Sequence, residues 1–129
     1  MNSEETLKKY GTKAKEYIGD KEKTEGLLNK VTKMLSKEGL SSIVTEIKDL
    51  ISYVSDVTKG RYKDYNGWAL STAIGAIIYV VSPIDVIPDF LAGLGFIDDV
   101  AIVGYAMKKL HDELQKYHQW KWKEEKKNE

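Results

Sequence analysis

The most constraining feature of this sequence is an apolar segment, residues 82–99, that carries four aspartates and both prolines of the chain. It lies between Lys63 and Lys108, a stretch without any lysine or arginine. A carboxylate held near apolar groups needs hydrogen-bond donors, a cation or a proton. Because no basic neighbour in sequence supplies the charge, these aspartates either organise the fold or form its functional site. They are Asp85, Asp89, Asp98 and Asp99.

The composition bounds the class of protein. A chain of 129 residues favours one domain with a real core. Its 20 basic and 20 acidic side chains cancel, which argues against a nucleic-acid partner. The absence of cysteine excludes disulfides, zinc–thiolate sites and thiol nucleophiles. Since the polar start, residues 1–5, is unlike a signal peptide, we expect a cytoplasmic protein.

Residues 65–84 raise the question of a membrane span, because they are uncharged and about as long as a spanning helix requires. Polar and helix-breaking residues interrupt them, including Asn66, Ser82 and Pro83. The truly apolar part, residues 73–81, is too short to cross a bilayer. We therefore expect a buried core helix, with membrane contact as the alternative.

Helical spacing of apolar residues dominates the chain and predicts an all-α fold. The cleanest stripe recurs at i, i+3, i+4 and i+7 between Leu40 and Val57, and shorter stripes lie at residues 7–18 and 27–35. Two N-caps and two glycine stops are predicted at the helix ends, and these are Asp20, Asn66, Gly39 and Gly60.

The second half of the chain predicts a hairpin. Residues 68–81 are apolar on nearly every side, as in a central helix. Ser82 and Pro83 are expected to end it, because a proline disfavours the helical conformation of the residue before it. A last helix follows Asp99 and runs through Tyr117. The prediction is a single small domain of about five helices, with an apolar helix–prolyl loop–helix hairpin at its centre.

The chain also divides into three segments that differ in their content of polar, apolar and charged residues. Residues 1–40 are predicted as peripheral polar helices, residues 41–120 as the helical core and residues 121–129 as a charged tail. The stripe of residues 40–57 should bury itself against the helix over residues 68–81. Its polar positions should then face outward, and these are Lys48, Asp49, Ser52 and Asp56.

The aspartate segment carries two motifs. Residues 82–89 read Ser-Pro-Ile-Asp-Val-Ile-Pro-Asp, and residues 95–99 read Gly-Phe-Ile-Asp-Asp. Both resemble the YkvA-like family of domains of unknown function, over about residues 53–107. The resemblance implies a small, mostly bacterial helical domain, often described as membrane-associated, with no established activity. The chain departs from the family at residues 92–93, where a third proline is common. The candidate site is therefore Ser82, Pro83, Asp85, Pro88, Asp89, Gly95, Asp98 and Asp99.

These aspartates allow two interpretations. Asp85 is expected in the first turn after Pro83, Asp89 follows Pro88, and Asp98 precedes a predicted helix. At such positions a carboxylate caps backbone N–H groups. Alternatively, Asp85 and Asp89 share one helical face and converge with Asp98 and Asp99 across the hairpin. Such a carboxylate cluster would suit a hard divalent cation. We expect capping and keep the metal site as the alternative.

Catalysis is the weaker interpretation, because no histidine, cysteine or lysine lies near the aspartates in sequence to assist them. His111 and His118 have a spacing that suits metal ligands but is also common on helix surfaces. Small residues over positions 67–76 would permit close helix packing or dimerisation. Trp120 and Trp122, among lysines, would suit a membrane interface.

Together these observations predict a non-enzymatic helical interaction module, cytoplasmic or membrane-associated. It would act through a protein partner, a homo-oligomer or a membrane surface, without nucleic acid and without a cofactor. The alternative is a carboxylate-based domain that binds a divalent metal or a small ligand, conceivably with hydrolytic activity.

Overall fold

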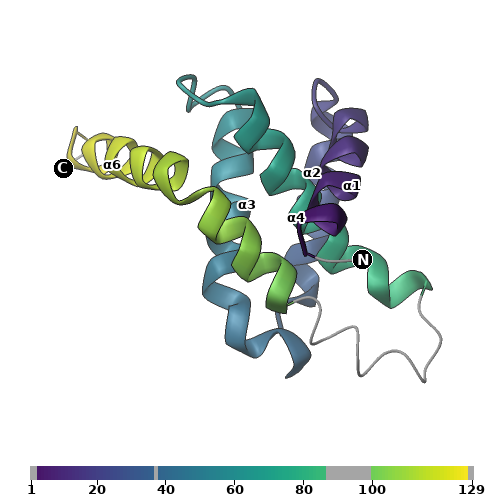
Figure 1. The fold of residues 1–129 in the computed structure, drawn as a ribbon. Helices are drawn as coiled ribbons and strands as arrows, with labels where there is room; N and C mark the ends of the chain where they lie inside the picture. The colour runs from purple at the N-terminus through teal and green to yellow at the C-terminus, as the bar shows by residue number, and fades with distance from the viewer. Residues whose placement is uncertain (1–2, 37, 87–99, 128–129) are drawn as a thin grey trace.

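The computed structural model describes residues 3–36, 38–86 and 100–127. Within them every regular element is a helix, which confirms the predicted all-α single domain (Figure 1). The α-helices are α1 (Ser3–Lys13), α2 (Lys21–Met34), α3 (Val44–Thr58), α4 (Gly67–Val86), a helix at residues 100–109, and α6 (His111–Lys127). Two short 3₁₀ segments, η1 (Ala14–Glu16) and η2 (Glu38–Ile43), lie between them.

Three of the four predicted helix boundaries are confirmed. The side chain of Asp20 accepts the Lys23 N–H at 3.0 Å and begins α2. Asn66 Oδ1 accepts the Trp68 N–H at 2.8 Å at the start of α4. Gly60 follows α3 with φ +77°, a conformation that glycine adopts without strain. The fourth prediction is wrong, because Gly39 lies inside η2 and α2 has already ended.

Helix α4 forms the centre of the domain, and α1, α2 and α3 all pack against it (Figure 1). Nearly every described side chain from Ala69 to Val81 is buried, so the all-round apolar sequence is explained by neighbours on several sides. The predicted stripe of residues 40–57 also lies in the core. Its first turn is 3₁₀ rather than α, and its fully buried members are Leu40, Ile43, Ile47, Leu50 and Val54.

Two helix boundaries differ from the prediction. Helix α4 does not end at Ser82 and Pro83 but continues to Val86. A proline crowds the preceding turn, yet the packing of a long buried helix outweighs that cost when only one turn remains. The last helix is not continuous, because a turn at Leu110 separates residues 100–109 from α6.

After the turn at Leu110, α6 changes direction, and its C-terminal end projects beyond the other helices (Figure 1). Leu110, Leu114 and Tyr117 are nevertheless buried, so the change of direction preserves their packing. Helix α6 also includes most of the predicted charged tail, since it runs to Lys127.

Candidate functional site

The motif predicted from the sequence is only partly covered by the structure. Ser82, Pro83 and Asp85 lie in the last turns of α4. The other motif residues, Pro88, Asp89, Gly95, Asp98 and Asp99, lie outside the described residues. Helix capping and divalent-metal binding at the motif therefore both stay predictions. In the described ranges, no three histidine, aspartate or glutamate side chains are grouped as a metal site requires.

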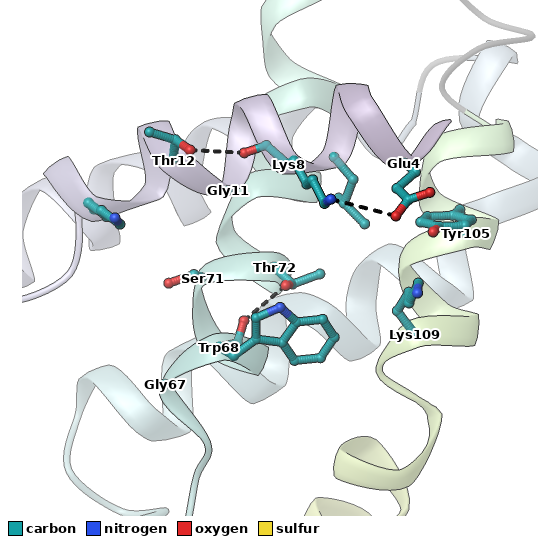
Figure 2. Close-up of a pocket in the computed structure, with 12 residues that line it drawn as sticks. Glu4, Lys8, Gly11, Thr12, Gly67, Trp68, Ser71, Thr72, Tyr105 and Lys109 are labelled. Atoms are coloured by element: carbon teal, nitrogen blue, oxygen red, sulfur yellow. Dashed lines mark hydrogen bonds and ion pairs between the residues drawn. The ribbon is translucent and has the colours of Figure 1, made fainter. Parts of the chain in front are cut away.

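The described residues form a groove of about 650 Å³ where α1 crosses the first turns of α4 (Figure 2). The helix over residues 100–109 closes its third side. We call it the α1–α4 groove. It is defined by Leu7, Lys8, Lys15, Trp68, Tyr105 and Lys109. Its volume lies within the range of about 300–1,000 Å³ that is typical of small-ligand sites.

Small residues give the groove its depth. Gly11 of α1 and Gly67 and Ser71 of α4 line it where the two helices meet. The side chain of Trp68 is the largest apolar wall, and it is 57% exposed although it belongs to the central helix. Figure 2 shows its indole on the α4 side facing Tyr105 and Lys109. An exposed tryptophan beside a concave surface is a common feature of binding sites.

The charge of the groove is positive. Three lysines and one glutamate line it, which gives a net charge of +2 in a chain whose total charge is zero. Glu4 pairs with Lys8 at 3.6 Å, one helical turn away. Lys109 lies 5.5 Å from the centre of the Tyr105 ring, a cation–π contact. Neither Lys15 nor Lys109 has a carboxylate partner in the described part of the chain.

A second polar group of residues joins α3 to α6, and we call it the α3–α6 polar cluster. At its centre is Asp56, which was expected to face outward but is only 6% exposed. Arg61 Nε donates to Asp56 Oδ1 at 2.8 Å, and the hydroxyl of Tyr117 donates to Oδ2. Lys121 Nζ lies 3.8 Å from Oδ2. The prediction failed because α6 and the loop after α3 cover this face with hydrogen-bond donors.

The same cluster holds a second carboxylate, which is half-buried. Glu113 Oε2 accepts the Tyr53 hydroxyl at 2.6 Å and the Asn66 N–H at 2.7 Å. Lys116 Nζ lies 3.1 Å from Oε1. Burial alone would raise the pKa of Glu113, but these three donors lower it below the usual value. Glu113 thereby ties α3 and the start of α4 to α6.

Ser52 of α3 also belongs to the cluster. Ser52 bonds the Tyr117 hydroxyl at 2.6 Å and accepts a hydrogen bond from Lys121. His118 pairs with Asp49 at 2.6 Å on the outer face and does not join His111 in a metal site within the described residues.

The buried tyrosines of the cluster give a prediction for alkaline pH. Burial, followed by the hydrogen bond to a carboxylate, raises the pKa of Tyr53 and of Tyr117 far above 10. Burial also raises the pKa of Tyr62. The unfolded chain releases these protons near pH 10, while the folded chain retains them. The contribution of these tyrosines to the free energy of unfolding is therefore complete below pH 10 and falls as pH rises further.

We therefore expect Tyr53 and Tyr117, two of the eight tyrosines, to ionise only when the protein unfolds, and Tyr62 to ionise at a higher pH than an exposed tyrosine. Tyrosinate absorbance and far-ultraviolet circular dichroism, followed together through an alkaline titration, would test this. The delayed tyrosinate absorbance should coincide with loss of helix, and Tyr53→Phe should remove part of it. Ionisation of all eight tyrosines near pH 10 with the helices intact would contradict the prediction.

Residues 69–105 match the family described as "Protein of unknown function (DUF1232)". The chain is 32% identical over 88 residues to a Bacillus subtilis (strain 168) protein named "Uncharacterized membrane protein YkvA". The aligned part covers 68% of this chain and 83% of that protein.

No solved structure matches the chain. Within the described ranges, none of the helices combines the length and the apolar character that crossing a bilayer requires. The matched residues include most of α4 and the prolyl segment that first suggested a family. The chain is similar to the Bacillus protein YkvA, and it belongs to the DUF1232 family of proteins of unknown function.

Proposed function

We propose that this protein is a non-enzymatic helical module that binds peripherally to the cytoplasmic face of a membrane through the α1–α4 groove. The observation that carries the proposal is the combination of exposed Trp68 with a net positive groove in a neutral chain. Tryptophan favours the boundary between headgroups and acyl chains, and lysine favours anionic membrane surfaces. The name of the Bacillus relative, a membrane protein, is consistent with this location.

Three segments of the chain fix the aromatic and cationic groups of the groove. Trp68 lies in the first turn of α4, and the Asn66 cap fixes the start of that turn. Lys15 and Lys109 lie on two other elements of the rim. Rigid helices therefore hold an apolar contact between two positive charges, an arrangement suited to a lipid surface rather than to the interior of a bilayer.

The two exposed tryptophans offer a matched test of the proposal. Trp122 of α6 is 59% exposed, close to the 57% of Trp68, and it also has lysine neighbours. Purified untagged protein would be sedimented with vesicles that contain phosphatidylglycerol and phosphatidylcholine. We expect binding that Trp68→Ala weakens more than Trp122→Ala does.

Salt provides a further control on the mode of association. In about 1 M salt the Debye length falls to about 3 Å, so a peripheral protein held partly by lysines should be released. Failure of the unmodified protein to sediment with any vesicle would overturn the proposed function. If Trp122→Ala weakens vesicle binding more than Trp68→Ala does, the membrane contact lies on α6 and not in the groove.

A further inference from the structure

From the charges of the α1–α4 groove we infer that it recognises anionic phospholipid headgroups, with Lys15 and Lys109 each pairing with a headgroup phosphate. This inference rests on the proposed function and adds the lipid class and the residues that select it. The two lysines are exposed, and neither has a carboxylate partner in the described residues. A phosphate oxygen would supply the missing partner at each position.

The lysines of α1 and of η1, which follows it, are not equally placed. Glu4 and Lys8 lie one turn apart on the face of α1 that lines the groove, and Lys15 of η1 lines it as well. Lys8 is already paired with Glu4, which reduces the net charge that it offers to a ligand. Lys9 lies on the same helix but does not line the groove. Among the described lysines on this side of the groove, Lys15 is therefore the one that can pair with an anionic ligand.

The third side of the groove supplies the second cation. Lys109 is placed over the Tyr105 ring, and Figure 2 shows it on the side of Trp68 that faces the helix over residues 100–109. The neighbouring Lys108 is exposed but does not line the groove. Because the two groove lysines belong to different elements, they are expected to contact separate headgroups and to contribute independently.

Polar and apolar groups between the lysines complete the footprint. The hydroxyl of Ser71 has no hydrogen-bond partner in the described residues, whereas that of Thr72 donates to the Trp68 carbonyl at 2.9 Å. Ser71 can therefore donate to a lipid oxygen. The indole of Trp68 would lie at the membrane–water interface, beside the glycerol backbone of the lipid. A zwitterionic headgroup brings its own ammonium group, which the positive groove would repel, so the groove favours an anionic lipid over phosphatidylcholine.

The test compares two double variants with the same loss of charge, and each variant has one change in residues 3–16 and one in the helix over residues 100–109. Lys15→Gln with Lys109→Gln removes the groove cations, and Lys9→Gln with Lys108→Gln is the control. Vesicles of phosphatidylglycerol and of phosphatidylcholine provide the two surfaces, and melting curves confirm that both variants fold. An interfacial lysine contributes about 1 kcal/mol, so the groove variant should bind phosphatidylglycerol roughly thirtyfold more weakly.

We expect each single groove variant to lose about fivefold, because the two contacts are independent. The control pair should lose less than fivefold, and soluble glycerol phosphate should not displace the protein from vesicles. An equal loss in the two double variants, or equal binding to the two lipids, would overturn this inference and leave the proposed function standing. Displacement by glycerol phosphate would identify a soluble anion as the ligand and overturn the lipid assignment. Absence of binding to both vesicles would instead refute the proposed function.

Discussion

Asp56→Ala should lower the free energy of unfolding by about 3 kcal/mol. The change removes the carboxylate that accepts hydrogen bonds from Arg61 and Tyr117 and leaves these donors without their buried partner. Removal of one member of a buried ion pair costs about 3–5 kcal/mol. The lower end applies here, because the side chains of Arg61 and Lys121 are 56% and 41% exposed and can turn toward water.

A second aspartate of the same helix provides the control. Asp49 pairs with His118 on the outer face at 2.6 Å, and an exposed pair of this kind contributes at most about 1 kcal/mol. Urea unfolding monitored by circular dichroism would measure both variants, and Asp56→Asn should lie between Asp56→Ala and the unmodified protein. If Asp56→Ala and Asp49→Ala cost the same, the α3–α6 polar cluster does not hold the two helices together.

Asp56 also shows where the sequence pattern stops being informative. The stripe of residues 40–57 marks the face of α3 that packs on α4, and that part of the prediction was right. A second face of α3 is covered by α6. The contacts between these two helices are polar, so the sequence of α3 has no apolar periodicity that would predict them. Its partners lie as many as 69 residues away in sequence, as with Ser52 and Lys121.

One signal for this cluster was available but ambiguous. Tyr53, Tyr62 and Tyr117 are fully buried, and the centroids of their rings lie 5.3–6.1 Å apart. Tyrosine is compatible with a half-exposed position as well as with a core, so the sequence alone did not show that these three residues meet. The α1–α4 groove was missed for a similar reason, because three segments distant in sequence build it.

The small-residue face of α4 was predicted more successfully. The two interpretations were close packing inside the monomer and dimerisation. A Cβ atom placed at Gly75 would lie 2.6 Å from the backbone nitrogen of Gly11 and 2.9 Å from its Cα atom. Helix α1 therefore crosses α4 at van der Waals distance at this point. Close packing inside the monomer is confirmed for Gly75, because the described structure leaves no space there for even one methyl group.

Gly75→Ala should accordingly destabilise the protein by about 2 kcal/mol. Backbone atoms of α1, rather than a mobile side chain, meet the added methyl group, so the two helices must move apart. Overpacking of this kind costs about 1–3 kcal/mol, and the higher helix propensity of alanine returns at most about 1 kcal/mol. The upper part of that range applies, because a shift of α1 also disturbs the burial of Leu7 and Ala14.

The same substitution elsewhere in the chain separates packing from propensity. Gly26 lies within α2, is exposed, and would place an added Cβ in open space. Gly26→Ala should therefore stabilise the protein by about 0.5–1 kcal/mol. Thermal melting of both variants would measure the two effects with opposite signs. A Gly75→Ala variant that melts as high as Gly26→Ala would show that α1 is free to shift on α4. The groove between these helices would then lack the rigid walls on which its proposed lipid contact depends.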